Sequence, residues 1–197
     1  MKLVFKTRNN HSVFSYWNKQ SGHAVFNKAG ICTGMVVVWI KKSIASEGRG
    51  LKEFGDTDIK ISSIIQASFT WKHLFPSKGL PYPDGIPILL QNQELISLRS
   101  TFGQMTVDRE RIAEWMLEKT GHFILMFFSK DGENSLYNGH SIGFRNENSV
   151  LEQFDPNLGL FWYDNIEQFK SYIAARLSVV YSGLDGNWYL HNVGLDT

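Results

Sequence analysis

The strongest constraint on the fold is an unbroken apolar run, Phe123-Ile124-Leu125-Met126-Phe127-Phe128. A strand with one exposed face alternates apolar and polar residues, whereas a strand buried on both faces is continuously apolar. We therefore predict that this run is a fully buried central strand of a sheet. Hydrophobic residues make up 43% of the 197 residues, which is enough for a sizeable core.

The patterning of the chain changes at His122, from helical periods to short strands. Before it, we predict a weak edge strand over 2–7, an extended loop over 76–87, and helices over 31–46, 58–74, 90–101 and 106–119. After it, we predict strands over 138–145, 149–155, 158–163 and 188–190, and a helix over 164–177. Helices followed by strands indicate an α+β fold with an antiparallel sheet. The length indicates a single domain over residues 1–197.

Charge and cysteine content exclude several classes of protein. Lys and Arg number 20 against 19 Asp and Glu, so the net charge of +1 gives no footprint for nucleic acid or an anionic membrane. A single cysteine excludes a disulfide framework and a cysteine-rich zinc site. The histidines outside the candidate site show no metal-ligand spacing, and we expect no cofactor; they are His11, His23, His73, His122 and His191.

The first ten residues lack the apolar core of a Sec signal peptide. No stretch approaches the roughly 18 consecutive apolar residues of a membrane-spanning helix. We therefore expect a chain that is made in the cytoplasm without a Sec signal peptide and does not insert stably into a membrane. Export by a route without a cleaved signal stays open.

The one cysteine, Cys32, directly precedes an apolar run of helical length. A thiol in the first turn of a helix is easier to ionise, because the unpaired N–H groups and the helix dipole favour negative charge there. The thiolate is the nucleophilic form. A lone cysteine is as often an inert core residue. The β-branched run Val36-Val37-Val38 has low helix propensity, so burial must hold this helix together.

Two further polar residues lie on predicted strands. His140 alternates with Ile142 and Phe144, which places the histidine on one face beside apolar residues. Asp155 ends the next strand, and Pro156 follows it. Taken alone, His140 is more often a core histidine and Asp155 a turn residue. Together they offer a general base and a carboxylate that orients it.

The hairpin between these two strands determines whether the pair meets. A two-residue loop at Glu147-Asn148 would pair Asn146 with Ser149 and place His140 directly opposite Asp155. The two Cβ atoms would then be about 4.5–5.5 Å apart. A three-residue loop would turn Asp155 to the other face, because a one-residue slip swaps the faces of a strand.

These segments together resemble a known family. Gly30-Ile31-Cys32, Gly139-His140 and Phe154-Asp155-Pro156-Asn157-Leu158-Gly159 resemble the motifs of the YopT-like and AvrPphB-like effector cysteine proteases of the papain clan. The resemblance covers roughly residues 18–175, as judged from the quoted motifs. It implies a papain-like fold in a bacterial virulence protein that is delivered into a host cell and cleaves a host protein.

The resemblance also implies roles for individual residues. Cys32 corresponds to the nucleophile, His140 to the general base and Asp155 to the residue that orients the imidazole. Asn27 resembles the side-chain amide that helps to form the oxyanion hole, with Gln20 as the alternative.

The chain departs from the family pattern at two positions. Members often carry a small residue and then serine after the cysteine, where this chain has Thr33-Gly34, and alanine or valine is commoner at the position of Ser141. Two other classes stay open. A transglutaminase or glutamine deamidase would use the same triad on a side-chain amide, and a catalytically silent domain would act only by binding. The oligomeric state and the substrate are not predicted.

Overall fold

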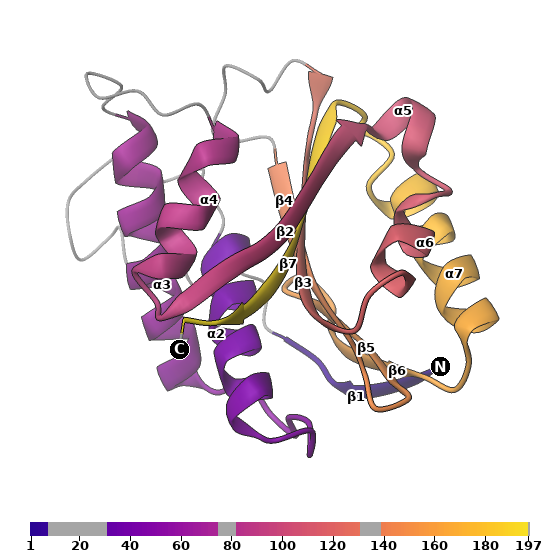
Figure 1. Ribbon diagram of the computed structural model, residues 1–197, viewed down its shortest axis with the longest axis horizontal. Coiled ribbons are helices and arrows are strands. Elements are labelled where there is room, and N and C mark those ends of the chain that lie inside the picture. The colour runs from indigo at the N-terminus through magenta and orange to yellow at the C-terminus, as the bar shows by residue number, and fades with distance from the viewer. Residues whose placement is uncertain (8–30, 75–81, 131–138, 197) are drawn as a thin grey trace.

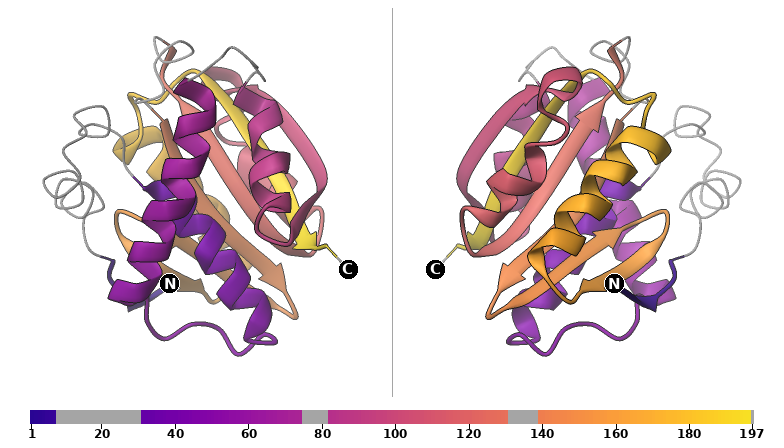
Figure 2. Two further views of the ribbon diagram at one scale, coloured as in Figure 1. Left: turned by 90° about the vertical axis from the view of Figure 1, so that its left-hand side faces the viewer. Right: turned by 90° about the vertical axis from the view of Figure 1, so that its right-hand side faces the viewer.

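The structure is a computed structural model that describes residues 1–7, 31–74, 82–130 and 139–196. Within these residues the chain forms a seven-stranded sheet with the order β1-β6-β5-β4-β3-β7-β2, in which neighbouring strands are antiparallel. Helices α2, α3 and α4 lie on one side of the sheet and α5, α6 and α7 on the other (Figure 1). Figure 2 views the molecule from each of these two sides.

The elements of the first half are mainly helical, as the sequence predicts. They are β1 (Lys2–Phe5), α2 (Cys32–Ala45), α3 (Asp56–Leu74), α4 (Tyr82–Gln91), β2 (Leu95–Gln104), α5 (Met105–Asp108) and α6 (Ile112–Leu117). The second half contains most of the strands. Its elements are β3 (Gly121–Phe128), β4 (Gly139–Glu147), β5 (Val150–Asp155), β6 (Gly159–Tyr163), α7 (Ile166–Ala175), the π-helical turn η4 (Arg176–Val180) and β7 (Asn187–Leu195).

Strand β3 is buried on both faces, which confirms the prediction from its apolar run. Ile124 and Met126 belong to the core on the α2 side of the sheet. Phe123, Leu125 and Phe127 belong to the core on the α7 side. Strands β4 and β7 flank β3, so its backbone is paired on both edges.

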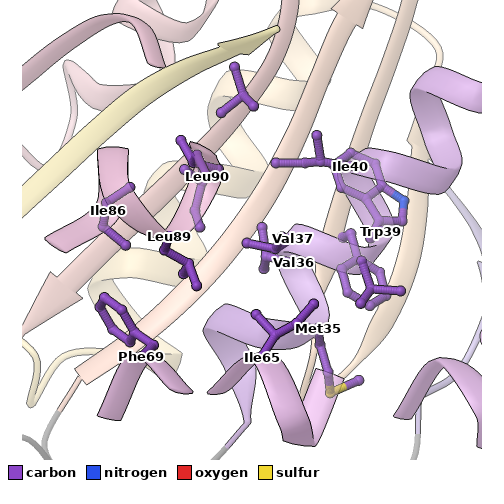
Figure 3. Packing of buried hydrophobic residues seen from close by; sticks show 14 of the residues in the cluster. Met35, Val36, Val37, Trp39, Ile40, Ile65, Phe69, Ile86, Leu89 and Leu90 are labelled. Carbon is purple, nitrogen blue, oxygen red and sulfur yellow. The ribbon is translucent and has the colours of Figure 1, made fainter. Parts of the chain in front are cut away.

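Helix α2 is held by burial, as its β-branched run requires. Val36, Val37 and Trp39 are buried in the core on this side of the sheet, to which α3 and α4 also contribute residues (Figure 3). Full burial of such a side chain contributes about 1.5–3 kcal/mol, whereas low helix propensity costs at most about 0.7 kcal/mol per residue. Tertiary packing therefore outweighs local preference here. The ring of Trp39 stacks on Phe154 of β5, with 5.6 Å between centroids.

The predictions for residues 82–87 and 95–101 are wrong, and residues 76–81 of the predicted loop lie outside the described residues. Helix α4 covers 82–91, where we predicted an extended loop, and β2 covers 95–104, where we predicted most of a helix. Proline is tolerated in the first turn of a helix, so Pro83 does not prevent α4 from forming. Glu94 adopts a φ of 59°, and the chain turns there. Strand β2 then forms by pairing with β7, a partner distant in sequence that local patterns cannot reveal.

Two other helices differ from their predicted bounds. The helix expected over 106–119 is split into α5 and α6. Helix α7 begins after Asn165, whose side chain accepts a hydrogen bond from the backbone N–H of Gln168 and so caps the helix. After Ala175 the helix widens into the π-helical turn η4. None of the helices in the described ranges is long and apolar enough to cross a bilayer.

We predict that Gly34→Ala destabilises the protein. A Cβ atom at Gly34 would lie 2.0 Å from the carbonyl oxygen of Ser62, so α2 and α3 would have to separate. Overpacking of this kind typically costs about 1–3 kcal/mol. Gly183→Ala is the matched control, because a Cβ there meets no atom within 4 Å. Urea unfolding measures both variants, and equal midpoints for the two would refute the close packing of α2 on α3.

Candidate active site

The structure brings the three predicted residues together. Cys32 is the first residue of α2, His140 the second of β4 and Asp155 the last of β5. The Nε2 atom of His140 lies 3.1 Å from Oδ1 of Asp155. The Cys32 thiol is hydrogen-bonded to the His140 side chain. His140 and Asp155 are buried, and Cys32 is half-buried.

The hairpin between β4 and β5 differs from the prediction by one residue. The ladder pairs Glu147 with Val150, so the loop is Asn148-Ser149. Both loop residues have positive φ, 51° and 64°. This conformation fits the twist of a two-residue hairpin, and asparagine tolerates it better than most residues.

The shift changes how the pair meets, but not which face it lies on. Continuing the ladder from Gly143 and Phe154 places Asp155 opposite Ile142, and His140 two residues further along β4. The prediction of a directly opposed pair is therefore wrong. The loop still has an even number of residues, so both side chains lie on the same face. They are diagonal neighbours, close enough for their hydrogen bond.

Strand β4 extends beyond its ladder with β5, and this brings Cys32 to the sheet. The last β4–β5 pair is Gly143 with Phe154, so Ser141 lies past the end of the ladder. The backbone N–H of Ser141 donates to the Cys32 sulfur. The side chains of Ser141 and Thr33 share a buried hydrogen bond of 2.8 Å. The start of α2 thus takes the place beside β4 that β5 leaves open.

The first turn of α2 supplies N–H donors to defined acceptors. Ile31 is the N-cap and offers no side-chain acceptor. The N–H of Thr33 donates to the Cys32 sulfur. The N–H of Gly34 donates to Oε1 of Gln66 on α3, at 3.1 Å. The position of the thiol in the first turn of α2 favours its ionised form.

The ionisation of Cys32 and His140 is coupled. Burial raises the pKa of the Cys32 thiol, but the hydrogen bond and charge of His140 outweigh it and hold that pKa below 9.0. Burial likewise lowers the pKa of His140, but hydrogen bonds to Asp155 and Cys32 outweigh it and raise that pKa to about 10. Near neutral pH this arrangement favours a thiolate beside an imidazolium, the reactive form of a catalytic cysteine.

Asp155 is charged because donors surround it. Burial raises the pKa of its carboxyl, but hydrogen bonds from His140, Tyr181 and the backbone of Asn157 hold the pKa below 3.8. An ionised carboxylate can only accept hydrogen bonds, so Nε2 of His140 must carry the shared proton. That leaves Nδ1 as the nitrogen that can exchange a proton with Cys32.

The Asp155–Gly159 turn fixes the carboxylate in place. The N–H of Asn157 donates to Oδ1 of Asp155 at 2.9 Å, which closes an Asx turn. Gly159 has a φ of 130°, and a Cβ there would lie 1.9 Å from the carbonyl oxygen of Phe5 on β1. The glycine of the motif is therefore required by the close approach of the edge strand.

Sequence reasoning missed Tyr181, which contacts both His140 and Asp155. Tyr181 lies directly after η4, in a segment without a motif, so no local signal pointed to it.

Asn27 and Gln20, the predicted oxyanion residues, lie outside the described residues and stay predictions. The described part of the chain holds no group of three or more His, Cys, Asp or Glu side chains that could bind a metal ion.

The chain has the α+β fold of the papain-like cysteine proteases, which confirms the predicted fold class. It is similar to the crystal structure of the Pseudomonas avirulence protein AvrPphB, with a TM-score of 0.65 and 14% identity over 84% of this chain and 92% of that one. A cysteine protease-like domain of the Photorhabdus asymbiotica toxin PaTox aligns with a TM-score of 0.43 and 11% identity, over 92% of this chain and 58% of that one. The fold therefore supports the resemblance to AvrPphB-like effectors. No family model and no curated protein matches the sequence.

We predict that the hydroxyls of Thr33 and Ser141 are energetically coupled. Thr33→Val or Ser141→Ala alone leaves one buried hydroxyl without its partner, which costs about 1–3 kcal/mol. The double variant removes both hydroxyls and should lose less stability than the two single losses added together. Urea unfolding of the four proteins measures the coupling, and strictly additive losses would show that the bond contributes nothing.

We predict that Cys32 is alkylated rapidly at neutral pH by a thiol-directed epoxide. His140 lowers the thiol pKa, so His140→Ala should slow the reaction at pH 7 by about tenfold for each unit by which the pKa rises. The rate is followed by intact-protein mass spectrometry between pH 5 and pH 9, about two units to either side of neutrality. Equal rates in the two proteins would identify an ordinary exposed thiol.

Proposed function

We propose that the protein is a thiol protease with Cys32 as nucleophile, His140 as general base and acid, and Asp155 as the residue that orients His140. The single observation that supports this most strongly is the buried hydrogen bond of 3.1 Å between Nε2 of His140 and Oδ1 of Asp155, with His140 also lowering the pKa of the Cys32 thiol. The donors around the sulfur and the carboxylate favour both charges of the reactive pair. The papain-like fold agrees with this chemistry.

The proposed reaction has two stages. The Cys32 thiolate attacks the carbonyl carbon of the scissile amide, and the proton on Nδ1 of His140 passes to the leaving amine, which leaves an acyl-thioester on Cys32. His140 then takes a proton from water, the water attacks the thioester, and the acid product departs while Cys32 regains its thiolate. Asp155 keeps the other imidazole nitrogen protonated throughout.

The oxyanion of each tetrahedral intermediate needs donors. The backbone N–H of Cys32, at the start of α2, is one proposed donor. The side-chain amide of Asn27 is the second, with Gln20 as the alternative. The Asn27 assignment rests on the family resemblance alone.

The proposed substrate is a host protein. AvrPphB is named as an avirulence protein of Pseudomonas, and we extend that setting to this chain as a bacterial effector acting in the cytosol of a host cell. It would act as a single protease domain over residues 1–197. The net charge of +1 favours neither nucleic acid nor a lipid surface as the partner.

We predict that Cys32→Ala and His140→Ala each reduce cleavage by about 10⁴-fold or more, because the residues of a triad act as a unit. Leu195→Ala is the control, since Leu195 is half exposed at the end of β7 away from His140. The substrate is a peptide library from a eukaryotic host proteome, and mass spectrometry maps new termini. Glutamine deamidation or cross-linking that depends on Cys32, without new termini, would replace the protease by an acyl-transfer enzyme. Full cleavage by either triad variant would refute the assigned residues.

A further inference from the structure

Tyr181 is the polar neighbour of the candidate triad that the proposed mechanism does not use. Its ring is buried on the α7 side of the sheet. The π-helical turn η4 places it there, because the backbone N–H of Tyr181 donates to the carbonyl of Arg176, five residues earlier, at 3.1 Å. Single π-helical turns within helices are rare and often lie at functional sites.

The phenol of Tyr181 forms hydrogen bonds with both His140 and Asp155. Its O–H donates to Oδ2 of Asp155 at 2.6 Å. Since that proton is used on Asp155, the lone pairs of the phenol oxygen face the N–H of His140, whose Nε2 lies 3.0 Å away. His140, Asp155 and Tyr181 therefore form a closed ring of hydrogen bonds.

The distribution of donors on Asp155 makes this contact specific. Nε2 of His140 and the N–H of Asn157 both bind Oδ1. Among the hydrogen bonds of the described residues, the one to Oδ2 comes from Tyr181. A buried carboxylate oxygen without a donor is costly, and the carboxylate could then rotate away from His140 to find one.

The ring of Tyr181 also restrains the imidazole. The two rings stack with 4.7 Å between centroids and 25° between planes. Phe127 of β3 meets each of them edge-on, at 5.7 Å from His140 and 5.2 Å from Tyr181. The imidazole is therefore held between two aromatic side chains.

We propose that Tyr181 is a positioning residue of the candidate protease, which holds the Asp155 carboxylate and the His140 ring so that Nδ1 faces Cys32. This inference rests on the proposed function and adds a fourth side chain to its machinery. Tyr181 acts through Asp155 and His140, not on the substrate.

The surrounding charges keep the phenol in its donor form. Burial and the charge of Asp155 raise the pKa of Tyr181, so the phenol is neutral across the working range. The other titratable or charged groups that influence this pocket are Cys32, His140, Tyr163, Tyr172 and Arg176. Tyr163 donates its own O–H to Oε1 of Gln153. The phenol in contact with Oδ2 is thus that of Tyr181.

The simplest alternative is that Tyr181 only fills the core. Tyr181→Phe separates the two roles, because it keeps the ring and removes the O–H. Tyr163→Phe is the matched control, since Tyr163 is also buried and also donates to a side-chain oxygen, but its partner is Gln153. A purely structural role predicts similar effects for the two variants.

The test compares the pH dependence of Cys32 alkylation and of peptide cleavage in the wild type and the two variants. Without a donor on Oδ2, the Asp155 carboxylate takes up a proton at higher pH and supports the imidazolium less well. We expect Tyr181→Phe to move the acid limb of the alkylation profile to higher pH, and to slow alkylation at pH 6 and the rate of cleavage by about tenfold. Tyr163→Phe should leave both profiles in place.

Unchanged profiles in Tyr181→Phe, or equal shifts in both variants, would overturn the proposal. Alkylation reports on the thiol without any substrate, so it tests Tyr181 even if the protein proves to cleave no peptide. If the alkylation rate of Cys32 is the same with and without His140, the reactive pair does not exist. The positioning role of Tyr181 is then refuted as well. Urea unfolding of both variants verifies that each remains folded at the assay pH.

Discussion

Strand β4 is longer than its neighbour β5 at the end where His140 lies, and the other features of the site depend on this mismatch. The ladder ends at Gly143, which leaves the N–H of Ser141 to donate to the Cys32 sulfur. If β5 continued, its backbone would take that N–H and occupy the place where α2 begins. A sheet edge that starts inside the molecule is normally a liability, because its backbone groups need partners. Here the side chain of Cys32, in the first turn of α2, provides one.

Helix α2 is fixed to the β4–β5 hairpin at both ends. At its start, Thr33 bonds Ser141, and Cys32 bonds His140. Beyond its other end, the carbonyl of Gly48 accepts a hydrogen bond of 2.9 Å from the buried guanidinium of Arg145 on β4. A helix of 14 residues is about 21 Å long, so the two attachments are far apart and set both the position and the direction of the helix. The thiol is therefore placed by the body of the fold and not by a local loop.

The sequence predicted the structure correctly where a periodic pattern determines whether a strand is buried or which face its side chains occupy. The apolar run of β3 required burial on both faces, and an even hairpin loop required His140 and Asp155 on one face even though the loop was misplaced by one residue. It was uninformative where a distant partner decides the outcome. Strand β2 exists because β7 pairs with it. Tyr181 is positioned by a π-helical turn, which has no residue pattern of its own.

The two departures from the family pattern are connected in the structure. Thr33 follows the cysteine and Ser141 follows the histidine, and their hydroxyls bond each other in the core. A single hydroxyl at either position would be buried without this partner, whereas a pair satisfies itself. The donors to the thiolate are backbone N–H groups of the same two residues, and a backbone group does not depend on the side chain it carries. The side chains can therefore change as a matched pair while the groups that bind the sulfur stay in place.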